Sequence, residues 1–441
     1  MNETLQVFID TIAKKGGRCL LIGGAVIDTI QSRIVKDWDI EIYGLSLVDI
    51  LSTLKELGHS FKLEGVSFGV IITKIGGVDI DLSVPRRENK IGVGHKRFNI
   101  ELDSMMTPKE AALRRDLTIN SMYRDLHTGE LIDPYNGLKD LHAGILRATN
   151  PDTFVEDPLR VLRIMQLLPR KGRVVEYDTK VLCSTIIDSF SELSKERVFE
   201  EFKKLLLKAE RPSMGLEFLK ECGWLVHFPE LLDLIGCEQN PEWHPEGDVW
   251  VHTLMVLDNA AQLRRHVPEE YRLAYMFAAL LHDIGKPSTT DKDLRSPKHD
   301  TAGIPLAKTF MERITDNKFL LELVPKLVGL HMRPGQLSSG NAKLSAWKRL
   351  HLLCRLDLLG WLSKADSAGR TGRSIRDKHL PSERCFQFHT SFPEKIEPLV
   401  KGRDLIQAGM TPSPKFTTIL NTAFELQLEG WNKENILKRI L

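Results

Sequence analysis

The chain has 441 residues, of which 42% are hydrophobic and 27% are charged, and its formal net charge is +2 at pH 7. This length predicts about two to four domains, the composition is typical of soluble globular proteins, and the small net charge neither requires nor excludes nucleic acid. No apolar run approaches the roughly 20 residues that cross a bilayer, the N-terminus lacks the segments of a signal peptide, and six scattered cysteines favour reduced thiols in a cytoplasmic protein.

The first predicted elements are a buried strand over residues 19–22, a glycine pair at Gly23 and Gly24, and a short helix. A glycine turn at a helix start offers free backbone N–H groups to an anion. Asp37 and Asp39 follow, on the same face of an extended strand. Because adjacent carboxylates repel each other unless a cation lies between them, the pattern indicates a divalent metal and phosphoryl or nucleotidyl transfer, although an isolated Asp-x-Asp is usually a surface turn.

A third carboxylate strengthens this interpretation. Residues 78–82 alternate apolar and acidic side chains, which predicts a strand with Asp79 and Asp81 on one face. Two metals that bridge an incoming nucleotide and an attacking hydroxyl need such a set of acids. Residues 1–145 therefore mix strands and helices around a candidate catalytic site.

From residue 146 onward helical periodicity replaces the strand signals. Residues 196–207 form a clear amphipathic pattern, with apolar side chains at helical spacing. A polar, proline-containing segment at 238–247 indicates a boundary, and a second helical block runs to about 368.

The second helical block carries an ordered series of histidines and aspartates. His282 and Asp283 end the apolar run 276–281, and the other members are His252, His299, His331 and Asp366. A single histidine on an apolar face is more often a satisfied core residue than a ligand. Neutral imidazoles and carboxylates suit divalent ions, and this spacing converges only in a folded helical bundle, so the series predicts a second metal site.

Six segments, in this order, carry a family resemblance: Gly23-Gly-Ala-Val-Ile-Asp28, Lys36-Asp-Trp-Asp39, Asp81 with Arg86 five residues later, Arg114-Arg-Asp-Leu-Thr-Ile-Asn120, Asp133-Pro-Tyr-Asn-Gly-Leu-Lys-Asp140, and Glu156-Asp-Pro-Leu-Arg160-Val-Leu-Arg163. They resemble the class II tRNA nucleotidyltransferases (CCA-adding enzymes) and bacterial poly(A) polymerases. The histidine series resembles the HD phosphohydrolase domain that is fused to some bacterial CCA-adding enzymes.

The resemblance implies an α+β fold: a nucleotidyltransferase head with a mixed β-sheet, then an all-α neck and body, then an all-α HD domain. The implied domains are the catalytic head (1–145), a helical neck with nucleotide-selecting and RNA-binding residues (146–235), the HD domain (236–370) and a helical tail in contact with tRNA (371–441).

The resemblance also implies residue roles in the head. Asp37 and Asp39 would bind Mg²⁺, and Asp81 would complete the catalytic set. The residues implied to bind the nucleotide are Gly23, Gly24, Asp28, Arg114, Arg115, Asp116, Asn120, Glu156, Asp157, Arg160 and Arg163. Glu156, Asp157 and Arg160 would act as the template for CTP and ATP, whereas helix-surface pairing of Arg160 and Arg163 with Glu156 is the structural alternative.

For the HD domain the resemblance implies a divalent ion, Mg²⁺, Mn²⁺ or Ni²⁺, held by His252, His282, Asp283 and Asp366. His299 and His331 are candidates for a second metal or a phosphate contact, and Lys286 for a phosphate-facing cation. The implied activity is a phosphodiesterase or phosphatase acting on 2′,3′-cyclic or 2′-phosphorylated ends.

The function implied for the whole chain is template-independent addition or repair of the 3′-terminal CCA of tRNA from CTP and ATP. Poly(A) polymerase, partial CC or A addition, and an HD phosphohydrolase with its head reduced to RNA binding remain alternatives. One departure bears on them: the family usually carries arginine before the aspartate of the first motif, where this chain has Ile27.

Overall fold

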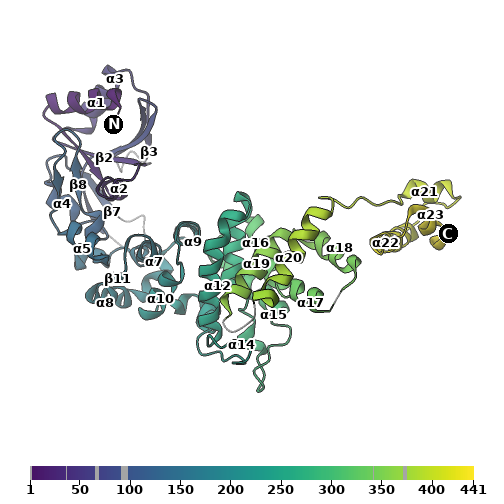
Figure 1. Cartoon of the computed structure of the whole chain (residues 1–441). Helices are drawn as coiled ribbons and strands as arrows, with labels where there is room; N and C mark the ends of the chain where they lie inside the picture. The colour runs from purple at the N-terminus through teal and green to yellow at the C-terminus, as the bar shows by residue number, and fades with distance from the viewer. Residues whose placement is uncertain (1, 36, 65–68, 91–97, 341, 371–374) are drawn as a thin grey trace. The chain divides into compact units, whose positions relative to one another are not determined.

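The computed structural model describes residues 2–35, 37–64, 69–90, 98–340, 342–370 and 375–441. The chain divides into two compact units: residues 1–205 with 214–227, and residues 206–213 with 228–441. The larger sheet lies near the N-terminus, and most of the remaining chain is helical (Figure 1), which confirms the predicted α+β class. Across the described ranges, no helix has both the length and the apolar character needed to cross a membrane.

The first unit contains a seven-stranded mixed sheet in the order β3-β4-β5-β2-β1-β8-β9. Strands β2 and β5 are parallel and the other neighbours are antiparallel. This register sets Asp39 opposite Asp81. The strands are β1 (Arg18–Ile22), β2 (Trp38–Tyr43), β3 (Phe61–Glu64), β4 (Val70–Ile75), β5 (Val78–Ser83), β8 (Tyr123–Asp125) and β9 (Leu131–Ile132).

The side-chain pattern explains this sheet. In β5 the inward residues Ile80 and Leu82 are buried, whereas Asp79 and Asp81, which alternate with them, are exposed, as the period of two requires. Helix α1 (Glu3–Lys14) begins at the N-cap Asn2, whose side chain accepts from the Leu5 amide, and buries one apolar face. The predicted strands at 19–22 and 78–82 are confirmed, whereas Lys36 of the predicted Lys36–Asp39 motif lies outside the described residues.

The first unit contains further strands and helices besides this sheet. A small antiparallel sheet joins β6 and β7, and a short parallel pair joins β10 and β11 within the otherwise helical part. The bounds are α2 (Gly24–Ile30), α3 (Leu47–Glu56), β6 (Arg86–Lys90), β7 (Phe98–Leu102), α4 (Pro108–Ala112), α5 (Gly137–Ala143), β10 (Ile145–Leu146), α6 (Pro151–Phe154), α7 (Leu159–Lys171), β11 (Val174–Val175), α8 (Tyr177–Thr185), α9 (Lys195–Lys208) and α10 (Ser213–Glu221).

The second unit is helical over its described residues. The apolar helix α13 is almost completely buried, which explains why its sequence carries no polar face. The bounds are α11 (Pro229–Leu232), α12 (Val249–Leu263), α13 (Arg272–Leu281), α14 (Lys286–Thr289), α15 (His299–Ile314), α16 (Lys318–Leu330), α17 (Arg333–Ser339), α18 (Leu344–Leu353), α19 (Leu356–Gly369), α20 (Ile375–Ser391), α21 (Gly402–Gln407), α22 (Lys415–Leu428) and α23 (Lys433–Ile440).

The last three helices, α21 to α23, share a small core of their own. Its buried members are Val400, Leu405, Ala423 and Ile436. The four-part division predicted from the sequence, with boundaries after 145, 235 and 370, is finer than the two compact units and stays a prediction.

Candidate functional site

A cavity of about 450 Å³ in the first unit gathers most of the residues predicted to bind a nucleotide. Its wall also contains Arg86 and Arg197, which were not predicted as site residues. The lining residues are Ile22, Gly23, Gly24, Asp39, Arg86, Arg114, Arg115, Asp116, Asn120, Asp157, Leu159, Arg160, Arg163 and Arg197. The predicted residues Asp28, Asp37, Asp81 and Glu156 are not part of this lining.

The predicted glycine turn forms one edge of the cavity. Gly23 has a φ of 63°, in the left-handed region that favours glycine, and precedes α2. Apart from the adjoining backbone, no heavy atom of the described residues lies within 4 Å of the position that a Cβ would take at either Gly23 or Gly24. The backbone at this edge is therefore open to a ligand.

Carboxylates gather where β2 and β5 run side by side. Asp39 is partly buried opposite Asp81, and Asp37 is exposed just before β2 begins. Burial raises the pKa of Asp39, and the neighbouring charges of Asp81 and Asp37 raise it further. Three acids that repel one another in this way form a donor set that a divalent cation would neutralise, so the residues fit the predicted metal site.

A buried carboxylate that sequence reasoning missed fixes the two predicted arginines. Glu41 is fully buried in β2, and its carboxylate accepts from Arg114 Nη2 at 2.6 Å and from the Tyr43 hydroxyl at 2.7 Å. Arg115 Nη2 lies 3.5 Å from the same carboxylate, and the Arg115 guanidinium lies over the Tyr123 ring. Burial would raise the pKa of Glu41, but Arg115 and Arg114 lower it, so the carboxylate is charged. A signal was present, because Glu41 continues the period-two acidic series of Asp37 and Asp39.

A second arginine–carboxylate pair also lines the cavity. Arg163 Nε donates to Asp116 Oδ2 at 2.7 Å, and Asn120 donates to Asp116 Oδ1 at 3.0 Å. Burial would raise the pKa of Asp116, but Arg163 and these hydrogen bonds lower it to about 2.

The residues of the predicted template motif are held by backbone and side-chain partners. Arg160 donates to the backbone carbonyls of Thr153 at 2.9 Å and Arg114 at 2.6 Å. Arg197, which lies 40 residues further along the chain, donates to Asp157 at 3.2 Å. These bonds fix a carboxylate and a guanidinium at the cavity wall.

The departure at Ile27 has a clear structural setting. Ile27 is 1% exposed and packs in the core on α2, whereas the adjacent Asp28 pairs with Arg33 at 2.9 Å and with Lys171 at 3.1 Å. The cationic partners of Asp28 therefore come from the segment that follows α2 and from α7, and not from the preceding residue.

In the second unit, the whole predicted histidine–aspartate series converges. Outside the series, His244 and Glu246 form one group with His252 whose ligand atoms are close enough to hold an ion. Within the predicted series, two groups have ligand atoms this close: His252, His282 and Asp366, and Asp283, His299 and His331. All six residues are buried. The helices α12, α13, α15, α16 and α19 bring them together from positions up to 114 residues apart.

Each of these histidines is oriented through its Nδ1. The Nδ1 atoms of His282, His299 and His331 hydrogen-bond to the backbone carbonyls of Ala279, Ser296 and Val328, each three residues earlier. The Nε2 atoms consequently face inward, with His252 and His282 at 3.4 Å and His299 and His331 at 3.3 Å.

These inward nitrogens support a cation site. If Nδ1 carries the proton in each neutral imidazole, each Nε2 atom carries a lone pair instead. Lone pairs that face each other repel unless a cation lies between them. The donor set of imidazole and carboxylate therefore fits a divalent ion in both groups.

Asp283 joins the two groups. Its Oδ2 lies 3.2 Å from His282 Nε2, and its Oδ1 lies 3.3 Å from His299 Nε2. Lys286 Nζ lies 2.7 Å from Asp283 Oδ2 and donates to Gln239 at 2.7 Å. The predicted cation at Lys286 is therefore buried against this shared carboxylate.

The close approach of α15 depends on Gly285, the residue before α14. A Cβ at Gly285 would lie 2.1 Å from the backbone oxygen of His299. Only glycine allows the start of α15 to lie so near to the turn after Asp283.

A cavity of about 720 Å³ opens beside this cluster. Its wall combines cationic and aromatic side chains with His299, a candidate metal ligand, a mixture that suits an anionic ester. The lining residues are Gln239, Asn240, Trp243, His244, Lys286, Asp293, Leu294, Arg295, Ser296, His299, Met332 and Arg370.

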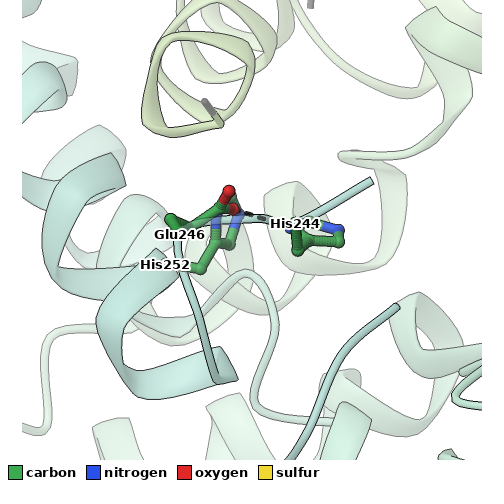
Figure 2. Close-up of side chains that lie close together, drawn as sticks. All are labelled: His244, Glu246 and His252. Atoms are coloured by element: carbon green, nitrogen blue, oxygen red, sulfur yellow. Dashed lines mark hydrogen bonds and ion pairs between the residues drawn. The ribbon is translucent and has the colours of Figure 1, made fainter. Parts of the chain in front are cut away.

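Sequence reasoning also missed Glu246, whose carboxylate hydrogen-bonds to His252 Nδ1 at 2.9 Å and to His244 Nδ1 at 2.9 Å (Figure 2). No spacing rule connects a loop glutamate to a helical histidine six residues later, so no sequence signal was available.

Comparisons with known proteins match these regions. The family model of the poly A polymerase head domain matches residues 19–147, that of the probable RNA and SrmB-binding site of polymerase A matches 175–235, and that of the HD domain matches 249–367.

Individual relatives cover most of the chain. The multifunctional CCA protein of Pseudoalteromonas atlantica is 34% identical over 367 residues, which cover 80% of this chain and 86% of that protein. A solved CCA-adding enzyme in its apo form II has a TM-score of 0.68 at 18% identity, covering 100% of this chain and 96% of that one. The Thermotoga maritima CCA-adding enzyme complexed with tRNA has a TM-score of 0.63 at 17% identity, covering 100% and 95%. At these identities the two solved structures show a shared fold.

Proposed function

Since the chain belongs to the family of multifunctional CCA proteins, we propose that it adds or repairs the 3′-terminal CCA of tRNA, using CTP and ATP. The observation that carries this proposal is one cavity in which the glycine turn, Asp39 and the arginines of three motifs converge. The relatives' name favours CCA addition over poly(A) synthesis, and the intact cavity favours a working head over one reduced to RNA binding.

In the head, Asp37 and Asp39 would hold Mg²⁺ and Asp81 would complete the catalytic set, because these oxygen donors gather at the parallel pair of strands. When bound, such ions lower the pKa of the attacking tRNA 3′-hydroxyl and neutralise the triphosphate and its leaving pyrophosphate. Arg114 and Arg115, fixed by Glu41, bind the phosphates of the nucleotide.

Selection of the base would rest on Glu156, Asp157 and Arg160. A carboxylate accepts from the exocyclic amine of cytosine or adenine, and a guanidinium donates to ring-nitrogen and carbonyl acceptors. Guanine and uracil present a different pattern of donors and acceptors, so GTP and UTP are rejected. The backbone bonds of Arg160 support this role because they fix the guanidinium before the base arrives.

The remaining parts would grip the tRNA. We assign the head to residues 1–145, the neck to 146–235, the HD domain to 236–370 and a tRNA-contacting tail to 371–441. Basic residues of the neck and tail contact phosphates and read no sequence. All six cysteines are free thiols, which supports a location in the cytoplasm, where thiols stay reduced.

In the test, the purified protein is incubated with tRNA that lacks its CCA end, together with one labelled nucleotide at a time. We expect CTP to be incorporated first and ATP afterwards, with no reaction from GTP or UTP. Asp39→Asn is expected to abolish incorporation, and the matched variant Asp79→Asn, which alters an exposed carboxylate of the neighbouring strand β5 outside the cavity lining, to preserve it. Incorporation by Asp39→Asn at the unchanged rate would contradict the proposal.

A second activity is favoured by the histidine–aspartate cluster. We propose that the HD domain hydrolyses phosphate esters, with 2′,3′-cyclic and 2′-phosphorylated ends as its substrates, using a divalent ion such as Mg²⁺, Mn²⁺ or Ni²⁺. Lys286 holds Asp283 in place, while Arg370, which pairs with Asp366 at 2.8 Å, presents a cation at the wall of the adjoining cavity. When bound, the ion activates a water for attack on phosphorus.

Single substitutions should distinguish the nucleotidyltransferase activity from the phosphohydrolase activity. Asp283→Ala is expected to abolish metal-dependent release of phosphate and to leave CTP incorporation intact, whereas Asp39→Asn is expected to do the reverse. Loss of both activities in either variant with folding intact would contradict two independent sites.

A further inference from the structure

His252 differs from the other three histidines of the histidine–aspartate cluster in the group that its Nδ1 hydrogen-bonds to. The other Nδ1 atoms bond to neutral backbone carbonyls, whereas His252 Nδ1 bonds to the carboxylate of Glu246. The side chain of Glu246 is 1% exposed, so this contact is shielded from water.

Glu246 is itself held in place by a second histidine. His244 Nδ1 bonds to the same oxygen, Oε1, and the two imidazole rings meet edge to face at 4.8 Å (Figure 2). In the close-up the other nitrogen of His244 points away from Glu246. The carboxylate is thus positioned between two imidazole rings, and one of them, that of His252, belongs to the histidine–aspartate cluster.

A charged group in this position requires an explanation. Burying a carboxylate is unfavourable unless it is paired, and a neutral amide would satisfy the Nδ1–H of His252 equally well as a hydrogen-bond acceptor. An anionic acceptor adds electron density to the imidazole and so makes its other nitrogen a stronger ligand. The negative charge, and not the hydrogen bond alone, is therefore the distinctive contribution of Glu246.

We propose that Glu246 is a positioning residue of the metal centre, which fixes the tautomer and ring orientation of His252 and strengthens Nε2 of His252 as a ligand. This inference rests on the proposed HD-domain activity. Nε2 of His252 already lies 3.1 Å from Asp366 and 3.4 Å from His282, at the place where an ion would bind.

The test measures metal affinity directly, by calorimetric titration of the full chain with Mn²⁺. Every protein carries Asp39→Asn to weaken binding in the head, and Asp283→Ala provides the blank that lacks the centre. Glu246→Gln is expected to weaken Mn²⁺ binding about 10- to 100-fold. The matched control is Glu242→Gln, an exposed carboxylate of the same loop, which is expected to bind as the parent does.

A thermal unfolding scan in chelator separates positioning from folding. We expect Glu246→Gln to unfold at nearly the parent temperature, since the amide still accepts from His252. Should that variant fail to fold, Glu246→Asp is the second variant. Its shorter side chain keeps the negative charge but places it farther from the His252 ring, and weaker Mn²⁺ binding is again expected.

The outcomes are distinguishable. Parental Mn²⁺ affinity in a folded Glu246 variant overturns the role of Glu246 alone. Absence of any binding beyond the Asp283→Ala blank in the parent protein overturns the metal-dependent hydrolase, and the inference with it.

Discussion

Glu41 provides the sharpest test of how the head is built. Glu41→Gln keeps the shape of the side chain but removes the negative charge that faces Arg114 and Arg115 inside the sheet. Breaking a buried ion pair leaves an uncompensated charge and costs about 3–5 kcal/mol. The amide retains one acceptor oxygen for Tyr43 or Arg114, so we expect the lower end of this range.

The assay is hydrogen exchange of the peptide that contains β2, because exchange follows the local free energy of opening. A loss of about 3 kcal/mol corresponds to exchange about 100-fold faster, at about 1.4 kcal/mol for each factor of ten. The KM for the nucleotide should rise in parallel, since both arginines lose the group that orients them.

The matched control is Glu56→Gln, which removes an exposed carboxylate paired with Lys15 at 2.5 Å in the same unit. Solvent screens that pair, so exchange of β2 should stay unchanged. If Glu41→Gln exchanges within about threefold of the parent, the carboxylate is not the countercharge of the arginines and the reasoning is refuted.

Three further predictions concern other contacts. The pKa of Asp116 is lowered to about 2, so the contribution of its carboxylate to stability is complete above its ordinary pKa and is lost as the pH falls toward 2. Arg163→Ala should therefore move the midpoint of acid unfolding, followed by circular dichroism, to higher pH. An unchanged midpoint would contradict the pairing of Arg163 with Asp116. Arg313→Met leaves Glu230 buried without its bidentate partner and should destabilise the second unit by about 3–5 kcal/mol in urea unfolding, whereas a change below about 1 kcal/mol would show that the pair is dispensable. Gly285→Ala should lower both the melting temperature and Mn²⁺ affinity by displacing the start of α15, and parental values for both would contradict this close approach.

Local patterns in the sequence were sufficient to predict the elements that position the proposed catalytic acids. The glycine turn, the alternation in β5 and the acid pair each depend on residues one or two positions apart, and the period of a strand fixes their geometry. Asp39 and Asp81 were therefore placed together correctly, although their register became visible only in the sheet.

The contacts that the sequence did not reveal are those set by packing. Arg197 reaches Asp157 because α9 packs near the start of α7, and no periodicity links positions 40 residues apart. Glu246 is invisible for a related reason: it lies in a loop, where orientation depends on tertiary contacts. Ile27 could be recognised as a departure, but the replacement partners of Asp28 could not.

The position of Asp283 has a consequence for the order in which ions would bind to the histidine–aspartate cluster. One carboxylate faces both groups of ligands, with Oδ2 toward His282 and Oδ1 toward His299. An ion bound on one side withdraws negative charge from the oxygen that serves the other side, so the two binding events are energetically coupled. We expect stepwise occupancy, in which the second ion binds more weakly than the first, and the coupling acts equally in both directions.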